Sequence, residues 1–324
     1  ALPLARLFSE DLLQIAEWRG LYLFELGMAL TCLGCVFLLK LPPGDRFKTF
    51  EKLDFLTFAI LATGVALLCA VLSLGRIDWW LEAPWIGIAS ACSLVLIMAG
   101  LAIELPRPPP LLTPRWLGGG AMIRLALAVI LIRMVLSEQS TGAVGFMQML
   151  NMSNEQMRTL YWVMLAGAIA GLAVSALTIN PAHLLMPLII SLAFMATGSV
   201  MDSFSSNLTR PQNMYISQFL LGFGGTFFLG PTMVLGTKNV LTNPRNLVSF
   251  SVLFGICQNL GGLIGAALLG TFQIVREKFH SSMIVEHLTL LDPRVAARVA
   301  SGGSAYGGGG GRPPGRNPKG VCRP

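Results

Sequence analysis

Charged side chains are scarce in this chain of 324 residues. Lys, Arg, Asp and Glu together make up 12% of it, whereas a soluble domain usually has about 25%. Hydrophobic residues make up 54%, and the mean hydropathy is +0.67. A water-soluble fold of this size could not bury so much apolar surface, so the composition excludes an ordinary soluble domain.

The sequence also lacks the motifs of common enzyme and metal-binding classes. It contains no GxxxxGK loop for nucleotide phosphates, and its three histidines have no HExxH-like spacing. Cys32 and Cys35 form a CxxC pair, but the pair lies in an apolar run without companion ligands, so helix packing is the simpler interpretation. We therefore predict no catalytic residue, no metal site and no cofactor.

The formal net charge of +7 would favour nucleic acid as a partner of a soluble protein. Here the basic residues lie mostly in short segments between apolar runs, where they set the orientation of a membrane protein. Nucleic acid is therefore not an expected partner, and the lipid bilayer is.

Long apolar runs make up most of the sequence. Several reach the roughly 20 residues that a helix needs to cross the hydrocarbon core of a bilayer. Because a helix satisfies its backbone groups within one such run, we predict an all-α integral membrane protein. The predicted spans are 20–39, 54–74, 84–103, 122–148, 159–178, 184–201, 214–235 and 248–273.

The basic residues of the loops predict an orientation. If the loop after the first span is cytoplasmic, the inner loops hold eight Lys and Arg residues and the outer loops hold three. Both ends of the chain then lie outside, in a multi-pass protein of the inner (plasma) membrane. Residues 276–300 are expected to form an outer segment with some helical character, and the Gly- and Pro-rich residues 301–324 to form a disordered tail.

Two groups of glycines lie in the last two predicted spans. Gly261 and Gly265 have GxxxG spacing, which lets a neighbouring helix approach closely. Gly222 and Gly225 give the span 214–235 a small and bendable face. Helix packing is the simpler interpretation of the GxxxG pair. For the span 214–235, a structural kink and a substrate path explain the glycines equally well.

Arg133 and Glu138 are unusual because they follow a strongly apolar run. If the fourth span ended near residue 137, Arg133 would reach the outer surface and Glu138 would lie in water. If the span is 122–148, Arg133 lies near mid-membrane and Glu138 about 7 Å further out. Both should then face protein or a wet cavity, where they neutralise each other or a substrate, or find partners on other helices.

Glu25 is the only charged residue in the run from Gly20 to Leu39. Burial in a low dielectric favours the neutral form of a carboxyl group, so Glu25 is a candidate for proton uptake and release. The alternative is a hydrogen-bonded structural carboxylate near the outer interface.

Taken together, several segments of the sequence resemble the fourteen-helix drug:proton antiporters of the major facilitator superfamily. The resemblance covers about residues 15–300. It is carried by EWRGLYLFELGMAL in the first span, Asp54 and Gly64 in the second, the outer tryptophans Trp79, Trp80 and Trp85, SEQSTGAVGFMQ in the fourth span, and SFSVLFGICQNLGGLIGAALLGTF in the last.

The resemblance implies an assignment for each part of the chain. Residues 1–53 would be the last helix of an amino-terminal bundle with a cytoplasmic loop, and residues 54–118 an inserted helix pair. Residues 119–275 would be five helices of a carboxy-terminal bundle. The chain would then be a fragment of such a transporter, with five helices missing before it and the tail in place of the final helix.

The resemblance also implies a function and a set of site residues. The expected function is proton-coupled efflux of amphipathic organic compounds or drugs, with protons and the substrate as small-molecule partners. The candidates for proton coupling are Glu25, Arg133 and Glu138. The candidates for the substrate cavity are Gln139, Trp162, Gln218, Phe223, Gln258 and Asn259.

Other interpretations stay open at this point. The chain could be a nonfunctional truncated product, or an interaction or assembly subunit without transport of its own. A membrane enzyme would need paired catalytic groups, and none is convincing. An envelope adaptor protein that docks onto residues 276–300 is a further open alternative.

Overall fold

The computed structural model describes residues 2–39, 52–107, 110, 112–181, 183–240, 246–288 and 291–299. Within these residues every regular element is a helix. Eight helical segments are long and apolar enough to cross a membrane, which confirms the predicted all-α, multi-pass membrane class. The chain divides into two compact units, Ala1–Gly270 and Thr271–Pro324.

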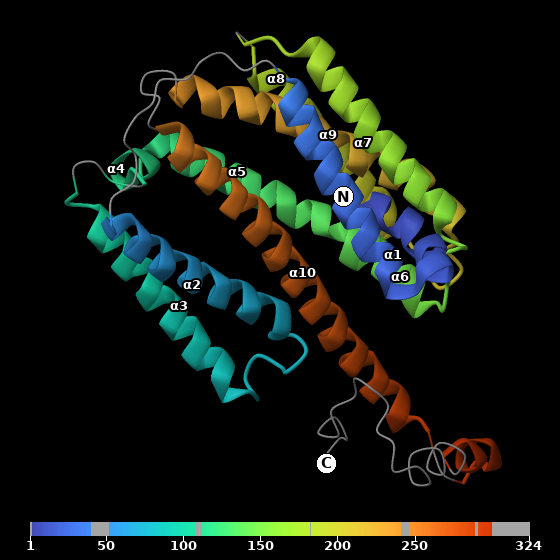
Figure 1. Ribbon diagram of the computed structural model, residues 1–324. Coiled ribbons are helices and arrows are strands. Elements are labelled where there is room, and N and C mark those ends of the chain that lie inside the picture. The colour runs from blue at the N-terminus through green and yellow to red at the C-terminus, as the bar shows by residue number, and fades with distance from the viewer. Residues whose placement is uncertain are drawn as a thin grey trace. The chain divides into compact units, whose positions relative to one another are not determined.

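The described helices follow the order of the predicted spans (Figure 1). The first three are α1 (Leu2–Leu38), α2 (Lys52–Leu74) and α3 (Pro84–Glu104). The short α4 (Pro114–Leu117) precedes α5 (Gly120–Ser137), the π-helix η1 (Glu138–Val144) and α6 (Gly145–Met149). The remainder are α7 (Arg158–Thr178), α8 (Leu185–Ser203), the 3-10 helix η2 (Pro211–Met214), α9 (Tyr215–Val240) and α10 (Asn246–Glu286).

The exposed surface of these helices is apolar and part of their interior is polar. Phe55 is 71% exposed and Leu177 is 86% exposed, whereas Glu104 and Gln218 are fully buried. In water this arrangement would be unfavourable, but in lipid the exposed apolar side chains meet hydrocarbon. The distribution of side chains therefore agrees with a membrane protein.

The fourth span is one continuous helical segment from Gly120 to Met149. This favours the longer of the two predicted spans, because Glu138 lies inside the segment and not beyond its end. The segment contains the π-helix η1, whose wider turn changes the faces on which the following side chains lie. Isolated π-helical turns inside α-helices are frequent at functional sites.

The first and last helices extend beyond the predicted spans. α1 starts at Leu2, well before residue 20, and its backbone has a positive φ of 51° at Glu17, where the apolar part begins. α10 continues to Glu286, because residues 274–286 contain neither Gly nor Pro.

The second unit begins within α10. A further helical stretch covers residues 293–299, and the Asp292 side chain accepts a hydrogen bond from the Arg294 amide at 2.8 Å. The helical character expected of residues 276–300 is therefore found in two parts. Residues 301–324 lie outside the described residues, as does most of the loop between the first two spans.

Helices α7, α8 and α9 pack closely because glycines lie where their backbones meet (Figure 1). A Cβ atom at Gly167 would lie 2.5 Å from the carbonyl oxygen of Phe219, and one at Gly198 would lie 2.8 Å from the carbonyl oxygen of Ser217. Leu221, in the second turn of α9, is fully buried and lies against Gly198 of α8. Small residues thus allow the backbones of these helices to approach closely.

Gly171 offers a test of this packing. A Cβ atom there would collide with the carbonyl oxygen of Phe223 and with the Thr226 hydroxyl. We expect Gly171→Ala to destabilise the bundle by about 1–3 kcal/mol, because the backbone must move to admit the methyl group. Gly255→Ala is the matched control, since nothing lies within 4 Å of a Cβ atom at that helical position. Melting of the detergent-solubilised variants checks the prediction, and equal melting temperatures would contradict it.

Candidate functional site

The centre of the candidate site is Glu138, the first residue of the π-helix η1. Its side chain lies over Gly142 in the next turn, where a Cβ atom would be only 3.0 Å from Glu138 Oε1. A larger residue at position 142 would therefore displace the carboxyl group. The wide turn and the glycine together direct Glu138 towards α8 and α9, with which it interacts.

Gln218 of α9 connects Glu138 to a second carboxyl group, that of Asp202 in α8. The Gln218 Nε2 group donates to Glu138 Oε2 at 3.1 Å and to Asp202 Oδ2 at 2.7 Å. The Ser217 hydroxyl donates to Asp202 Oδ1. Gln218 is fully buried and Ser217 is buried, whereas Glu138 and Asp202 are half-buried. Because both carboxyl groups accept from the same nitrogen, they lie close to each other. We call Glu138 and Asp202 the carboxyl pair.

The carboxyl pair has the chemistry of a proton-binding site. Two carboxylates that approach each other inside a protein repel strongly, and a proton shared between them removes one of the two charges. Gain or loss of this proton changes the charge held by half-buried groups between η1, α8 and α9. The described residues provide no ion-pair partner for either carboxyl group.

Arg133, five residues before Glu138, lies against another helix. Its Nε group donates to the backbone oxygen of Gln258 in α10 at 3.0 Å. One turn further along α5, the Ser137 hydroxyl donates to the backbone oxygen of Gly262 at 2.9 Å. Arg133 and Glu138 therefore do not form an ion pair with each other in the described structure, and each finds its partners on other helices.

The close approach of α5 and α10 depends on the GxxxG pair. A Cβ atom at Gly261 would lie 2.7 Å from the backbone oxygen of Ile130, and one at Gly265 would lie 2.7 Å from that of Met134. The two glycines thus allow Arg133 and Ser137 to reach the α10 backbone. Helix packing accounts for both positions.

A cavity of about 640 Å³ lies beside these residues. Its lining is largely apolar, with Ile132, Leu136 and Phe228 among the contributors, and Arg133 faces it. Predicted cavity residues that line it are Gln139, Gln258 and Asn259, together with Gly222 and Gly225 from the glycine groups. The volume lies within the range of about 300–1,000 Å³ that is usual for small-molecule sites.

Gln139 connects the cavity to the carboxyl pair. Its side chain lines the cavity, and its Nε2 group donates to the backbone oxygen of Gln218 at 3.2 Å. Gln139 follows Glu138 in η1, and Gln218 binds both carboxyl groups. A movement of η1 relative to α9 would therefore change the cavity and the carboxyl pair together.

The structure places three other predicted site residues elsewhere. Trp162 is 51% exposed on α7 and does not line the cavity. Phe223 packs against Phe194, Phe219 and Phe227, with ring centroids 5.0–6.4 Å apart. Glu25 is exposed on α1. None of the three contacts the carboxyl pair in the described residues.

Asp202 and Ser217 were not among the residues predicted from the sequence. The predicted span ended at residue 201, so Asp202 counted as part of the outer loop. α8 continues to Ser203, and this extra half-turn brings the carboxyl group into the bundle. A carboxylate immediately after an apolar run is the signal that could have found it.

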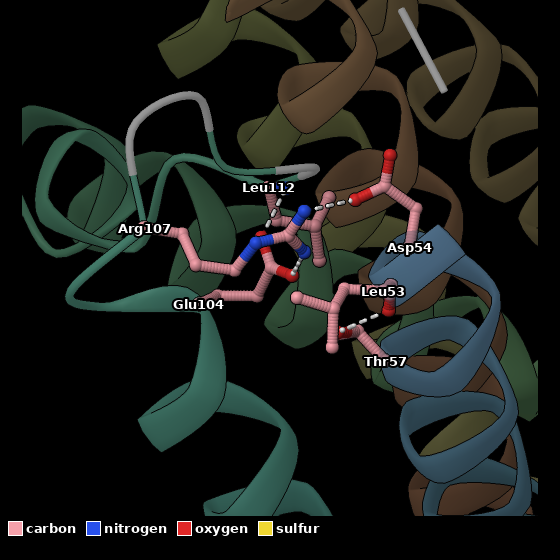
Figure 2. Close-up of polar contacts among 6 residues, drawn as sticks. All are labelled: Leu53, Asp54, Thr57, Glu104, Arg107 and Leu112. Atoms are coloured by element: carbon pink, nitrogen blue, oxygen red, sulfur yellow. Dashed lines mark hydrogen bonds and ion pairs between the residues drawn. The ribbon is translucent and has the colours of Figure 1, made fainter. Parts of the chain in front are cut away.

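A second buried polar cluster lies where α2 begins and α3 ends (Figure 2). The Arg107 guanidinium lies 2.8 Å from Asp54 Oδ1 and 3.0 Å from Glu104 Oε1. Glu104 Oε2 also accepts a hydrogen bond from the Leu112 amide at 3.2 Å. The ion cluster thus joins α2, α3 and the following loop, and a structural role accounts for it.

Comparison of the chain with family models, with curated proteins and with solved structures finds no match. A function must therefore be inferred from the carboxyl pair and the cavity. The two features share structural elements, since both involve η1 and α9.

Proposed function

We propose that the chain is part of a proton-coupled transporter of the major facilitator type, which exports amphipathic organic compounds across the inner membrane. The observation that carries the proposal is the half-buried carboxyl pair, joined through the buried Gln218 and through Gln139 to a cavity inside the helical bundle. Ionisable groups inside a membrane bundle commonly mark ion and substrate pathways.

The carboxyl pair and the cavity are coupled in this proposal because η1 and α9 contribute to both. When the carboxyl pair loses its proton, two negative charges remain close together in a medium of low dielectric, and their repulsion favours separation of η1 from α8 and α9. Because Gln139 in η1 also lines the cavity, this separation changes the cavity. A substrate that stabilises one arrangement of η1 must in turn change the affinity of the pair for a proton.

α9 has features that permit such a movement. Gly230 precedes Pro231 inside this helix, and proline removes one backbone hydrogen bond from a helix interior. A bend at this position would change the distance between the two ends of the helix. Alternating access in transporters commonly uses discontinuous or bent helices of this kind.

A role as an assembly subunit is the second candidate function. It is favoured by α1, because the most apolar window of Glu17–Leu38 contains no buried residue. This surface would suit another membrane helix, either of a longer transporter or of a separate subunit. An envelope adaptor bound to residues 276–300 belongs to the same candidate.

Reconstitution into liposomes tests the proposed function. Three pyrene-labelled alkyl probes of equal chain length, ending in a sulfonate, a trimethylammonium or a hydroxyl group, serve as substrates. With the proposed function, an imposed pH gradient drives at least one charged probe across the membrane, and collapse of the gradient by a protonophore stops the movement. Equal probe movement in protein-containing and protein-free liposomes would contradict transport and leave the assembly role.

A further inference from the structure

The cavity lining carries a positive charge, that of Arg133, which the carboxyl pair does not neutralise. Among the described residues that line the cavity, Arg133 is the only one with a formal charge. Both members of the carboxyl pair hydrogen bond to Gln218, and neither pairs with Arg133 among the described residues. The cavity therefore contains a positive charge without a counterion from the described chain.

The geometry of Arg133 leaves donors available to a ligand. A guanidinium has five N–H donors, and one of them, on Nε, donates to the backbone oxygen of Gln258. That bond fixes the orientation of the group. The terminal nitrogens have no acceptor among the described residues, and Gly262 opposite them has no side chain to cover them, since a Cβ atom there would lie 3.4 Å from Nη2.

An unneutralised arginine inside a membrane protein is unfavourable unless it meets water or an anion. The planar fork of a guanidinium matches carboxylate, sulfonate and phosphate oxygens, to which it donates two parallel hydrogen bonds. The remaining lining is mostly apolar, with neutral polar groups from Gln139 and Asn259. A ligand that fits these surroundings has an anionic head and an apolar body.

We infer that the cavity selects amphipathic anions and that Arg133 binds their head group. This inference rests on the proposed function and specifies its substrate class. It excludes lipophilic cations as preferred ligands, because Arg133 would repel them and the described residues that line the cavity include no carboxylate. The anion can come from two sources, a free amphiphile or the head group of an anionic lipid.

Binding measurements on the purified chain test the inference without any need for transport. In nanodiscs of phosphatidylcholine, fluorescence titration gives the affinity for the pyrene-labelled sulfonate, trimethylammonium and hydroxyl probes. We expect the sulfonate to bind about ten- to a hundredfold more tightly than the hydroxyl probe, as for a hydrogen bond to a charged group, and the cation to bind more weakly than either. Tighter binding of the cation by the unaltered chain would overturn the inference.

Two variants locate the selectivity. Arg133→Gln should remove the preference for sulfonate, whereas Arg133→Lys should retain part of it, because it keeps the charge and loses the fork. Arg124→Gln is the matched control, since Arg124 is an exposed residue of the same helix and bonds only to the Gly120 carbonyl in the described structure. Unchanged sulfonate affinity in Arg133→Gln would overturn the assignment of the head-group site.

Two further comparisons identify the source of the anion and separate this inference from the proposed function. Loss of sulfonate binding in phosphatidylglycerol nanodiscs would assign the Arg133 site to a lipid head group, and unchanged binding would assign it to a free amphiphile. Either result supports anion recognition. Sulfonate binding without pH-driven movement would refute the proposed function alone, and pH-driven movement of the cation alone would refute the inference alone.

Discussion

We expect Glu138→Gln to abolish pH-driven movement of the substrate probe while the probe still binds to the cavity. Of the changes considered, this one should have the largest effect on activity. The amide has nearly the shape of the carboxyl group and can still contact Gln218, but it cannot release a proton. The initial rate under a pH gradient should fall at least about tenfold, which corresponds to about 1.4 kcal/mol. Glu138 does not line the cavity, and glutamine mimics its protonated form, so the probe should still bind with the affinity that it has for the protonated pair.

Substitution of Asp202, the second member of the carboxyl pair, should have the same effect as substitution of Glu138. Asp202→Asn is expected to lose pH-driven movement, and the double variant should be no worse than either single variant, because the two groups form one site. Glu155→Gln is the matched control, since Glu155 is an exposed residue between α6 and α7. Full pH-driven movement in Glu138→Gln would remove the carboxyl pair from the coupling mechanism.

Arg107→Leu has the largest expected effect on stability. Arg107 joins Asp54 and Glu104, whose side chains are 6% and 0% exposed, and its own side chain is 12% exposed. Removal of one partner from a buried ion cluster costs about 3–5 kcal/mol, because buried charge loses its compensation. Thermal unfolding in detergent, followed by the loss of monodisperse protein, measures the effect.

Arg158→Leu provides the comparison for this prediction. Arg158 pairs with Asp11 at 3.0 Å, but the two side chains are 51% and 48% exposed. An exposed pair contributes at most about 1 kcal/mol, so its loss should hardly change the unfolding temperature. If Arg107→Leu and Arg158→Leu unfold at the same temperature, the ion cluster does not stabilise the fold. Replacement of both Arg107 and Glu104 by leucine should restore part of the stability, since only Asp54 then lacks the guanidinium.

The spans could be predicted from the sequence because hydrophobic length and the breaks between runs determine them directly. The predicted start of α2 at residue 54 and its end at residue 74 differ from Lys52–Leu74 by two residues at most. The start of α1 at Leu2 was not predicted, because residues 2–16 are helical without being apolar enough to span. Apolar length indicates spans, but it does not indicate their helical extensions.

The composition of the candidate site was harder to predict. Arg133 and Glu138 are five residues apart, so on a regular helix their side chains lie about 140° apart and face different neighbours. Their actual partners, Gln258 and Gln218, lie more than 75 positions further along the chain, at separations of 125 and 80 residues. Such partners depend on which helices pack together, and the hydropathy of the sequence does not determine these helix contacts.

Asp202 and Glu104 show the same limit at the ends of spans. Each lies one residue beyond a predicted span, where a charged residue is normally assigned to water. In the structure Glu104 is fully buried, and Asp202 hydrogen bonds to the buried Gln218 and Ser217. A charged residue at a span end needs a partner on a neighbouring element. The partner of Glu104 is Arg107, and that of Asp202 is Gln218. These pairs depend on how the elements pack together.

Proton release or uptake on ligand binding shows directly whether the cavity and the carboxyl pair are coupled. The purified chain in weakly buffered detergent solution, with a pH-sensitive dye, receives the pyrene-labelled sulfonate at a saturating concentration. If the cavity and the carboxyl pair are coupled, binding changes the pH of the solution, the change disappears in the Glu138→Gln/Asp202→Asn double variant, and it persists in Glu155→Gln. Sulfonate binding without any proton exchange, or with equal exchange in the double variant, would show that the cavity and the carboxyl pair are not coupled.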